Sequence, residues 1–202
     1  MAKKRKKKQK TPAVIAGLIL ILCGFVFSLI SLSDVNLPGI ALQHKEEKNI
    51  SKEEFVDRLL PHAKELQDGY GILPSIILGQ AILESNWGQS QLAKDYNNLF
   101  GVKAYGKQKK VKLNTKEYYN EQWITIKGEF RVYDSWEDSM DDHTALFVNG
   151  VDWNPQKYET VLTAQNYEEA ADALQEAGYA TDPDYAQKIK SVIKEHKLYK
   201  YD

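Results

Sequence analysis

The stretch from Pro74 to Gly88 restricts the fold of this chain more than any other part of the sequence. Its residues are almost all apolar, and Glu84 is the only ionisable side chain among them. Pro74 suits the first position of a helix, where its missing N–H would have no partner in any case, and Gly88 suits a helix end. The stretch therefore predicts a largely buried helix with one carboxyl group near its C-terminal end.

The position of Glu84 suggests a chemical role. An apolar surround disfavours the charged carboxylate, so we expect the pKa of Glu84 to be raised. A carboxyl group that keeps its proton near neutral pH can protonate a leaving sugar oxygen, as the general acid of a glycosidase does. The ordinary alternative is a solvated glutamate at a helix end. The apolar run before Glu84 and the turn after it favour the catalytic interpretation.

Several blocks of the sequence resemble the glucosaminidase family of bacterial cell-wall hydrolases, glycoside hydrolase family 73, whose fold is related to lysozyme. They occur in the family's order, and the resemblance as a whole covers about residues 50 to 197. The blocks are Gln80-Ala81-Ile82-Leu83-Glu84-Ser85-Asn86-Trp87-Gly88, Asn97-Asn98-Leu99-Phe100-Gly101-Val102-Lys103, Thr115-Lys116-Glu117-Tyr118, Phe130-Arg131-Val132-Tyr133 and Gly178-Tyr179-Ala180-Thr181-Asp182-Pro183-Asp184-Tyr185-Ala186.

The resemblance implies a peptidoglycan hydrolase that cleaves the β-1,4 bond after N-acetylglucosamine, with Glu84 as the general acid. Two alternatives stay open. One is a muramidase or lytic transglycosylase on the same fold, because fold does not fix function. The other is a non-catalytic scaffold that binds glycan, although an intact block around Glu84 favours an active enzyme.

Most glycosidases use a second carboxyl group, and the resemblance points to Glu117. An exposed hairpin glutamate is the ordinary alternative for that residue. Other acids nearby are further candidates for the second group: Glu121, Glu129, Asp134 and Asp138. The 2-acetamido group of the substrate can also serve as an internal nucleophile, so retaining, inverting and substrate-assisted mechanisms are all open.

Aromatic residues are candidates for sugar contacts, since sugar rings stack on aromatic faces. Tyr179 and Tyr185 flank a Thr-Asp-Pro helix start, and we expect at least one of them to line the active site, with Tyr179 as a catalytic candidate. We expect substrate contacts from Tyr185 and from Asn97, Asn98, Phe100, Tyr133 and Trp136. The Asn pair has an alternative role in turns or caps. For Trp123, Phe130 and Trp153 we expect core positions.

The N-terminus has the pattern of a membrane anchor. Residues 1–10 contain seven Lys or Arg and no acid, and residues 13–32 carry no charge. Twenty helical residues span roughly 30 Å, the thickness of a bilayer core. The pattern predicts a basic cytoplasmic tail over 1–12, a transmembrane signal-anchor helix over 13–32, an outer stalk over 33–49 and a catalytic domain over 50–202 on the cell-wall side. A cleaved signal peptide is the alternative.

The charge balance and the Cys and His content exclude several classes. Beyond the basic tail, 20 basic residues face 28 acidic ones, a net charge unsuited to nucleic acid. Cys23 is the only cysteine, and the four His show no H-x-x-x-H or H-E-x-x-H spacing. We expect no metal and no cofactor. The expected partners are peptidoglycan glycan strands and membrane lipid around residues 13–32, with the protein as a monomer.

Residue patterns predict an α+β domain. A capping box at Ser51-Lys52-Glu53-Glu54 opens an amphipathic helix, and further helices are expected over 90–95, 135–148, 167–177 and 183–196, the last with Pro183 at its first position. Residues 100–133 predict a β region, with strands over 123–126 and 129–133 around a turn at Lys127-Gly128, and 111–115 as a partner strand. With the resemblance, we expect a mostly helical lysozyme-like domain with a small β-hairpin lobe.

Overall fold

The computed structural model describes residues 50–119 and 122–202. The tail, the transmembrane helix expected over 13–32 and the stalk lie outside the described residues. Among the helices within the described ranges, none combines the length and apolar character needed to cross a bilayer.

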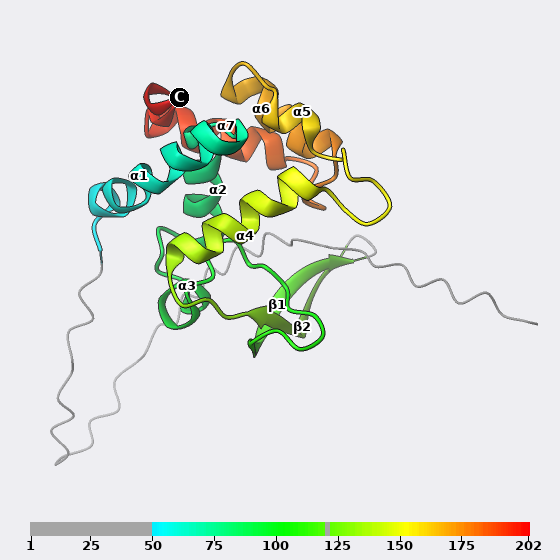
Figure 1. The fold of residues 1–202 in the computed structure, drawn as a ribbon. Coiled ribbons are helices and arrows are strands. Elements are labelled where there is room, and N and C mark those ends of the chain that lie inside the picture. Colours follow the sequence, from blue (N-terminus) through cyan, green and yellow to red (C-terminus); the bar gives the residue numbers. More distant parts are fainter. Residues whose placement is uncertain (1–49, 120–121) are drawn as a thin grey trace, which may run out of the picture.

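The described domain is mostly helical, with one two-stranded antiparallel sheet. Helices α1, α2, α6 and α7 gather into one body, and α4 lies between that body and the hairpin (Figure 1). The α+β prediction with a small hairpin lobe is therefore confirmed. The helices are α1 (Lys52–Tyr70), α2 (Pro74–Ser85), α3 (Gln91–Tyr96), α4 (Trp136–Asn149), α5 (Glu159–Leu162), α6 (Tyr167–Glu176), α7 (Tyr185–Glu195) and the 3-10 helix η1 (Leu198–Tyr201).

Helix α2 forms the centre of the helical body. Its residues from Pro74 to Ile82 are all buried, and α1, α6, α7 and η1 pack around it. A helix that is apolar on every side reaches stability only when it is enclosed in this way. The structure therefore confirms the buried helix that the sequence predicted.

The ends of the helices follow local side-chain chemistry. The capping box predicted at Ser51 is present, with Glu54 bonded back to the Ser51 N–H at 2.9 Å. Helix α2 begins at Pro74 as predicted, but it ends at Ser85 with Asn86 in the left-handed conformation at φ 51°. The expectation that Gly88 closes the helix is wrong, because Asn also tolerates that conformation.

The last long helix begins later than the sequence predicted. Helix α7 starts at Tyr185, so Pro183 lies in the turn before it. The Asp182 carboxylate accepts the Asp184 N–H at 3.0 Å, and a side chain that bonds the backbone two residues on favours a turn over a helix. This turn brings Tyr185 to the first position of the helix.

The hairpin differs from the prediction in its turn. Strand β1 (Lys110–Tyr119) pairs with β2 (Gln122–Arg131), and Gly128 lies inside β2 opposite Leu113. The partner strand was predicted, but the turn at Lys127-Gly128 is wrong. A Cβ at position 128 would lie 2.7 Å from Lys103 Nζ and 3.1 Å from the Phe130 ring. The glycine thus marks a close approach of side chains rather than a turn.

Two of the three core expectations for aromatic residues can be compared with the structure. Phe130 is buried as expected. Trp153 is 63% exposed, so its predicted core position is wrong. It occupies the tip of the turn between α4 and α5, where the described residues leave most of the indole uncovered. The Trp123 side chain lies outside the described part of the structure.

Candidate active site

Glu84 and Tyr185 form the centre of the candidate site. Glu84 lies in the last turn of α2 and is half-buried, and Tyr185 is the first residue of α7 and is fully buried. The Tyr185 hydroxyl donates to Glu84 Oε1 at 3.0 Å, across 101 residues of sequence. The two motifs that carry these residues therefore meet through a direct hydrogen bond.

Gln80 fixes the direction of this hydrogen bond. It precedes Glu84 by four residues, so both side chains lie on the same side of α2. Its Nε2 donates to the Tyr185 hydroxyl at 2.9 Å, and the amide is fully buried. A hydroxyl that accepts from an amide has its own proton left to donate, and here the proton is directed to Glu84. Our sequence reasoning missed Gln80, although an amide one turn before Glu84 in an apolar helix was a usable signal.

Tyr179 lies one ring away from this pair. Its ring stacks on Tyr185 with centroids 5.5 Å apart, and its hydroxyl lies 2.9 Å from His143 Nε2. Both Tyr179 and His143 are buried, and burial lowers the pKa of His143 to about 3. The His143 imidazole is therefore neutral at physiological pH. Tyr179 supports Tyr185 through the ring stacking.

Phe100 and Trp136, two expected substrate contacts, are buried in the core. Phe100 stacks on His143 at 3.9 Å between ring centroids. Trp136 donates from Nε1 to the Ala93 carbonyl at 3.0 Å, and a Cβ at Gly88 would lie 2.6 Å from its ring. In these positions both rings support the turn and helices around Glu84 through packing.

The two asparagines act in turns, which is the alternative that the sequence left open. Asn98 is buried, and its amide donates to the carbonyls of Val102 and Arg131 at 2.9 and 2.8 Å. Asn97 adopts a left-handed conformation at φ 53°, and its amide donates to the Tyr133 carbonyl at 3.2 Å. Both side chains tie the segment after α3 to the end of β2.

Tyr133 and Arg131 join the hairpin to α4 through Asp142. The Tyr133 hydroxyl donates to one Asp142 oxygen at 2.5 Å, and Arg131 Nη1 donates to the other at 2.6 Å. Burial, together with this carboxylate, raises the pKa of Tyr133 far above its ordinary value. Tyr133 is therefore held as a neutral donor beside the hairpin.

The candidates for the second carboxyl group differ in their surroundings. Backbone pairing places Glu117 in β1 opposite Ile124, and its side chain lies outside the described part, as does Glu121. Glu129 pairs with Lys110 at 2.7 Å, and this ammonium lowers the pKa of the carboxyl. Asp134 pairs with Lys109 at 3.0 Å, and Asp138 accepts from the Ser135 N–H in a capping box. Three of the alternatives to Glu117 thus take part in structural contacts.

The described residues offer no ready metal site. Over 50–119 and 122–202, no three His, Cys, Asp or Glu side chains come together in a way that could hold a metal ion.

Comparison with known proteins places the chain among glucosaminidases. Residues 60–198 match the glucosaminidase family, described as mannosyl-glycoprotein endo-beta-N-acetylglucosaminidase. The chain is 44% identical over 202 residues to the exo-glucosaminidase LytG of Bacillus subtilis, and the match spans all of this chain and 70% of LytG. It is 37% identical over 155 residues to a probable N-acetylmuramidase of Lactococcus lactis, covering 75% of this chain and 35% of that protein.

A solved structure agrees with the fold. The catalytic domain of the autolysin Auto from Listeria monocytogenes superposes with a TM-score of 0.68 at 35% sequence identity. The match covers 75% of this chain and 87% of that domain.

Proposed function

Because the chain belongs to the glucosaminidase family of glycoside hydrolases, we propose that it cleaves the β-1,4 bond of peptidoglycan after N-acetylglucosamine with Glu84 as the general acid. The observation that carries this proposal is the hydrogen bond from the Tyr185 hydroxyl to Glu84 Oε1 at 3.0 Å. It orients the one carboxyl group of an otherwise apolar helix at that helix's half-buried end. A general acid needs such a fixed position relative to the leaving oxygen.

The reaction requires Glu84 to give a proton to the glycosidic oxygen as the C–O bond breaks. The positive charge that develops on the sugar ring then needs a nucleophile or a stabilising anion. We assign this role to Glu117, which belongs to the block Thr115-Lys116-Glu117-Tyr118 in strand β1 of the hairpin. The substrate's own 2-acetamido group is the alternative, and in that case Glu117→Gln would retain near-normal turnover.

The choice of bond separates the proposed glucosaminidase from a muramidase. One relative of this chain carries the name of an exo-glucosaminidase and another that of a probable N-acetylmuramidase. The match to LytG is longer and stronger in identity, which favours cleavage after N-acetylglucosamine. New N-acetylmuramic acid reducing ends among the products would contradict this choice.

We also propose that residues 13–32 anchor the enzyme in the cell membrane with the catalytic domain on the cell-wall side. The support is the uncharged stretch of bilayer length and the seven basic residues that precede it. Fractionation of cells that express the full chain tests the proposal, since loss of the anchored form on deletion of 13–32 is expected.

The deciding experiment is digestion of purified peptidoglycan by the full chain and by its Glu84→Gln variant. Mass spectrometry of the reduced products identifies the sugar at each new reducing end. We expect N-acetylglucosamine ends from the parent enzyme and none from the variant. Equal product release from both proteins would refute Glu84 as the general acid.

A further inference from the structure

Trp153 is far more exposed than a tryptophan in a folded core. Its side chain is 63% exposed, whereas Trp136 is 6% exposed. It stands at the tip of the turn between α4 and α5, and Figure 1 shows this yellow segment projecting beyond the helices. At this exposure the indole keeps an apolar ring face that a ligand can cover.

The turn that carries Trp153 is well fixed. Val151 and Asn154 exchange two backbone hydrogen bonds of 3.0 and 2.8 Å, with Asp152 and Trp153 between them. Gly150 enters the turn at φ +64°, and a Cβ there would lie 2.3 Å from the Pro155 carbonyl oxygen. The Asn154 side chain also accepts the N–H of residue 156 at 3.2 Å. The indole is therefore presented from an ordered base.

The same turn is braced against the aromatic cluster of the candidate site. Phe147 precedes the turn and Tyr158 follows it, and their rings contact each other at 5.2 Å between centroids. Tyr158 also contacts Tyr179 at 6.3 Å, and Tyr179 stacks on Tyr185. Only two ring contacts thus separate the base of the turn from the tyrosine that bonds Glu84.

The neighbours of Trp153 indicate what kind of molecule fits. Asp152 and Asn154 flank the indole and are exposed polar groups, which suit the hydroxyl and acetamido edges of a sugar whose C–H face covers the ring. A protein partner needs roughly 800 Å² of surface on each side, more than a single indole supplies. An anionic membrane surface attracts basic residues, whereas the Asp152 carboxylate beside the indole would repel it.

We propose that Trp153 forms a second glycan contact, at which its indole stacks on an N-acetylated sugar of the strand that Glu84 cleaves. The proposal rests on the proposed function for the identity of the ligand. It assigns the turn between α4 and α5 a part in holding the polymer, separate from the chemical step at Glu84.

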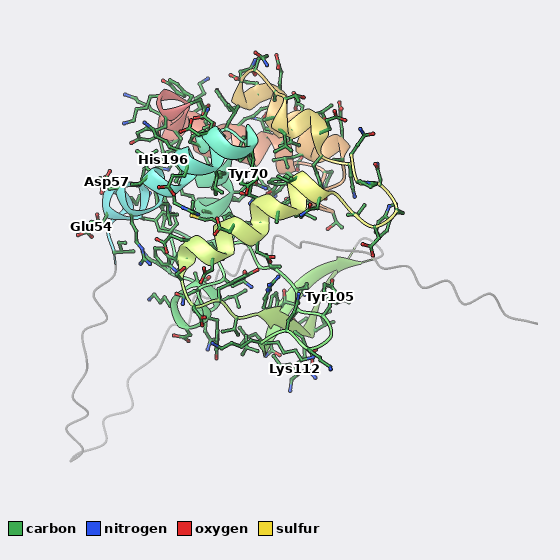
Figure 2. The ribbon with its side chains drawn as sticks, viewed as in Figure 1. Glu54, Asp57, Tyr70, Tyr105, Lys112 and His196 are labelled. Carbon is green, nitrogen blue, oxygen red and sulfur yellow. The ribbon has the colours of Figure 1, made fainter. Side chains whose placement is uncertain are left out.

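Binding measured without cleavage tests the proposal. Every protein in the test is the full chain with Glu84→Gln, titrated with soluble N-acetylglucosamine oligomers. Each variant adds one further substitution: Trp153→Ala, Trp153→Phe or Tyr70→Ala. Tyr70 on α1 is the matched exposed aromatic control. Figure 2 shows Tyr70 on the helical body, away from Tyr105 and Lys112 of the hairpin lobe. Tryptophan emission is recorded in parallel, because a sugar stacked on an exposed indole shifts its emission to shorter wavelength.

We expect Trp153→Ala to weaken binding roughly fivefold, in line with the strength of aromatic stacking contacts, while Trp153→Phe retains most of the affinity and Tyr70→Ala all of it. The emission shift should disappear in both Trp153 variants. Unchanged affinity in Trp153→Ala, or an equal loss in Tyr70→Ala, would overturn the proposal. Failure of the proposed function is a separate result, because the protein with Glu84→Gln as its single substitution would then still cleave glycan.

Discussion

The hydroxyl of Tyr185 is held between two polar side chains of the same helix, accepting from Gln80 at 2.9 Å and donating to Glu84 at 3.0 Å. Gln80 and Tyr185 are both fully buried, and only Glu84 reaches toward solvent. The arrangement sets the orientation of a reactive carboxyl group from inside the protein. It also couples α2 to α7, which are far apart in the sequence.

Replacing Tyr185 with Phe should lower kcat on peptidoglycan by roughly tenfold to a hundredfold. The ring keeps its stacking on Tyr179, but Glu84 loses its donor and Gln80 loses its acceptor, each an unmade hydrogen bond of about 1–3 kcal/mol. Turnover measured across pH checks this, because the alkaline limb of the profile, on which the general acid loses its proton, should shift together with the rate. An unchanged profile with a lower rate would instead indicate a packing defect.

Replacing Gln80 with Met should lower kcat less, by roughly threefold to tenfold. Met fills a similar volume in the core, and Tyr185 keeps its bond to Glu84 but loses the amide that fixes its proton. The double variant with Tyr185→Phe tests the coupling, since residues in one network do not act additively. Additive effects of the two substitutions would refute a shared role.

The helices were predictable from the sequence because their ends carry local signals. The capping boxes at Ser51 and Ser135 satisfy backbone groups within a few residues. Pro74 lacks the N–H that would have no partner at the start of its helix. Glu84 stood out for a similar reason, as the one ionisable group in an apolar helix. Local patterns of this kind do not depend on the rest of the fold.

Features set by distant neighbours were not predictable in the same way. Gly128 was interpreted as a turn because nothing local reveals that Lys103 approaches it. Trp153 was expected in the core because hydrophobicity does not show which elements are near enough to cover it. The hydrogen bond from Tyr185 to Glu84 depends on the start of α7, which Asp182 moves past Pro183.

His62 should contribute stability that is lost as the pH rises above 6.5. It belongs to α1 and faces α4, with Nδ1 2.9 Å from Glu65 of its own helix and Nε2 2.7 Å from Asp141 of α4. Burial alone would lower the pKa of His62, but the hydrogen bonds and charges of Asp141 and Glu65 outweigh it and raise the pKa above 6.5. The folded state therefore holds the proton more tightly than the unfolded chain.

The stabilisation by His62 is fully present below pH 6.5 and disappears as the pH rises through the raised pKa of the folded state. Thermal unfolding followed between pH 5 and pH 9 should show this decline in the parent protein. His62→Gln keeps hydrogen-bonding capacity but cannot carry the charge, and should flatten the decline. An NMR titration of His62 at or below 6.5 would contradict the prediction.

His143 should produce the opposite pH dependence. It is enclosed by Phe100, Phe147 and Tyr179, and among the described residues its Nδ1 has no hydrogen-bond partner. Burial lowers its pKa from 6.5 to about 3 in the folded state. Between these values the unfolded chain binds a proton that the folded protein excludes, so the free energy of unfolding decreases as the pH falls, by up to about 1.4 kcal/mol per pH unit.

A variant without a titrating group isolates this effect. His143→Gln retains a side chain that can reach the Tyr179 hydroxyl but takes up no proton, so its stability should depend less on pH between 6 and 4 than that of the parent. Urea unfolding at several pH values measures the difference, and the carboxyl groups common to both proteins cancel in the comparison. Because His143 holds Tyr179 against Tyr185, acid unfolding should begin in the cluster that supports Glu84. Parallel stability curves for the two proteins would show that the buried imidazole is not the cause.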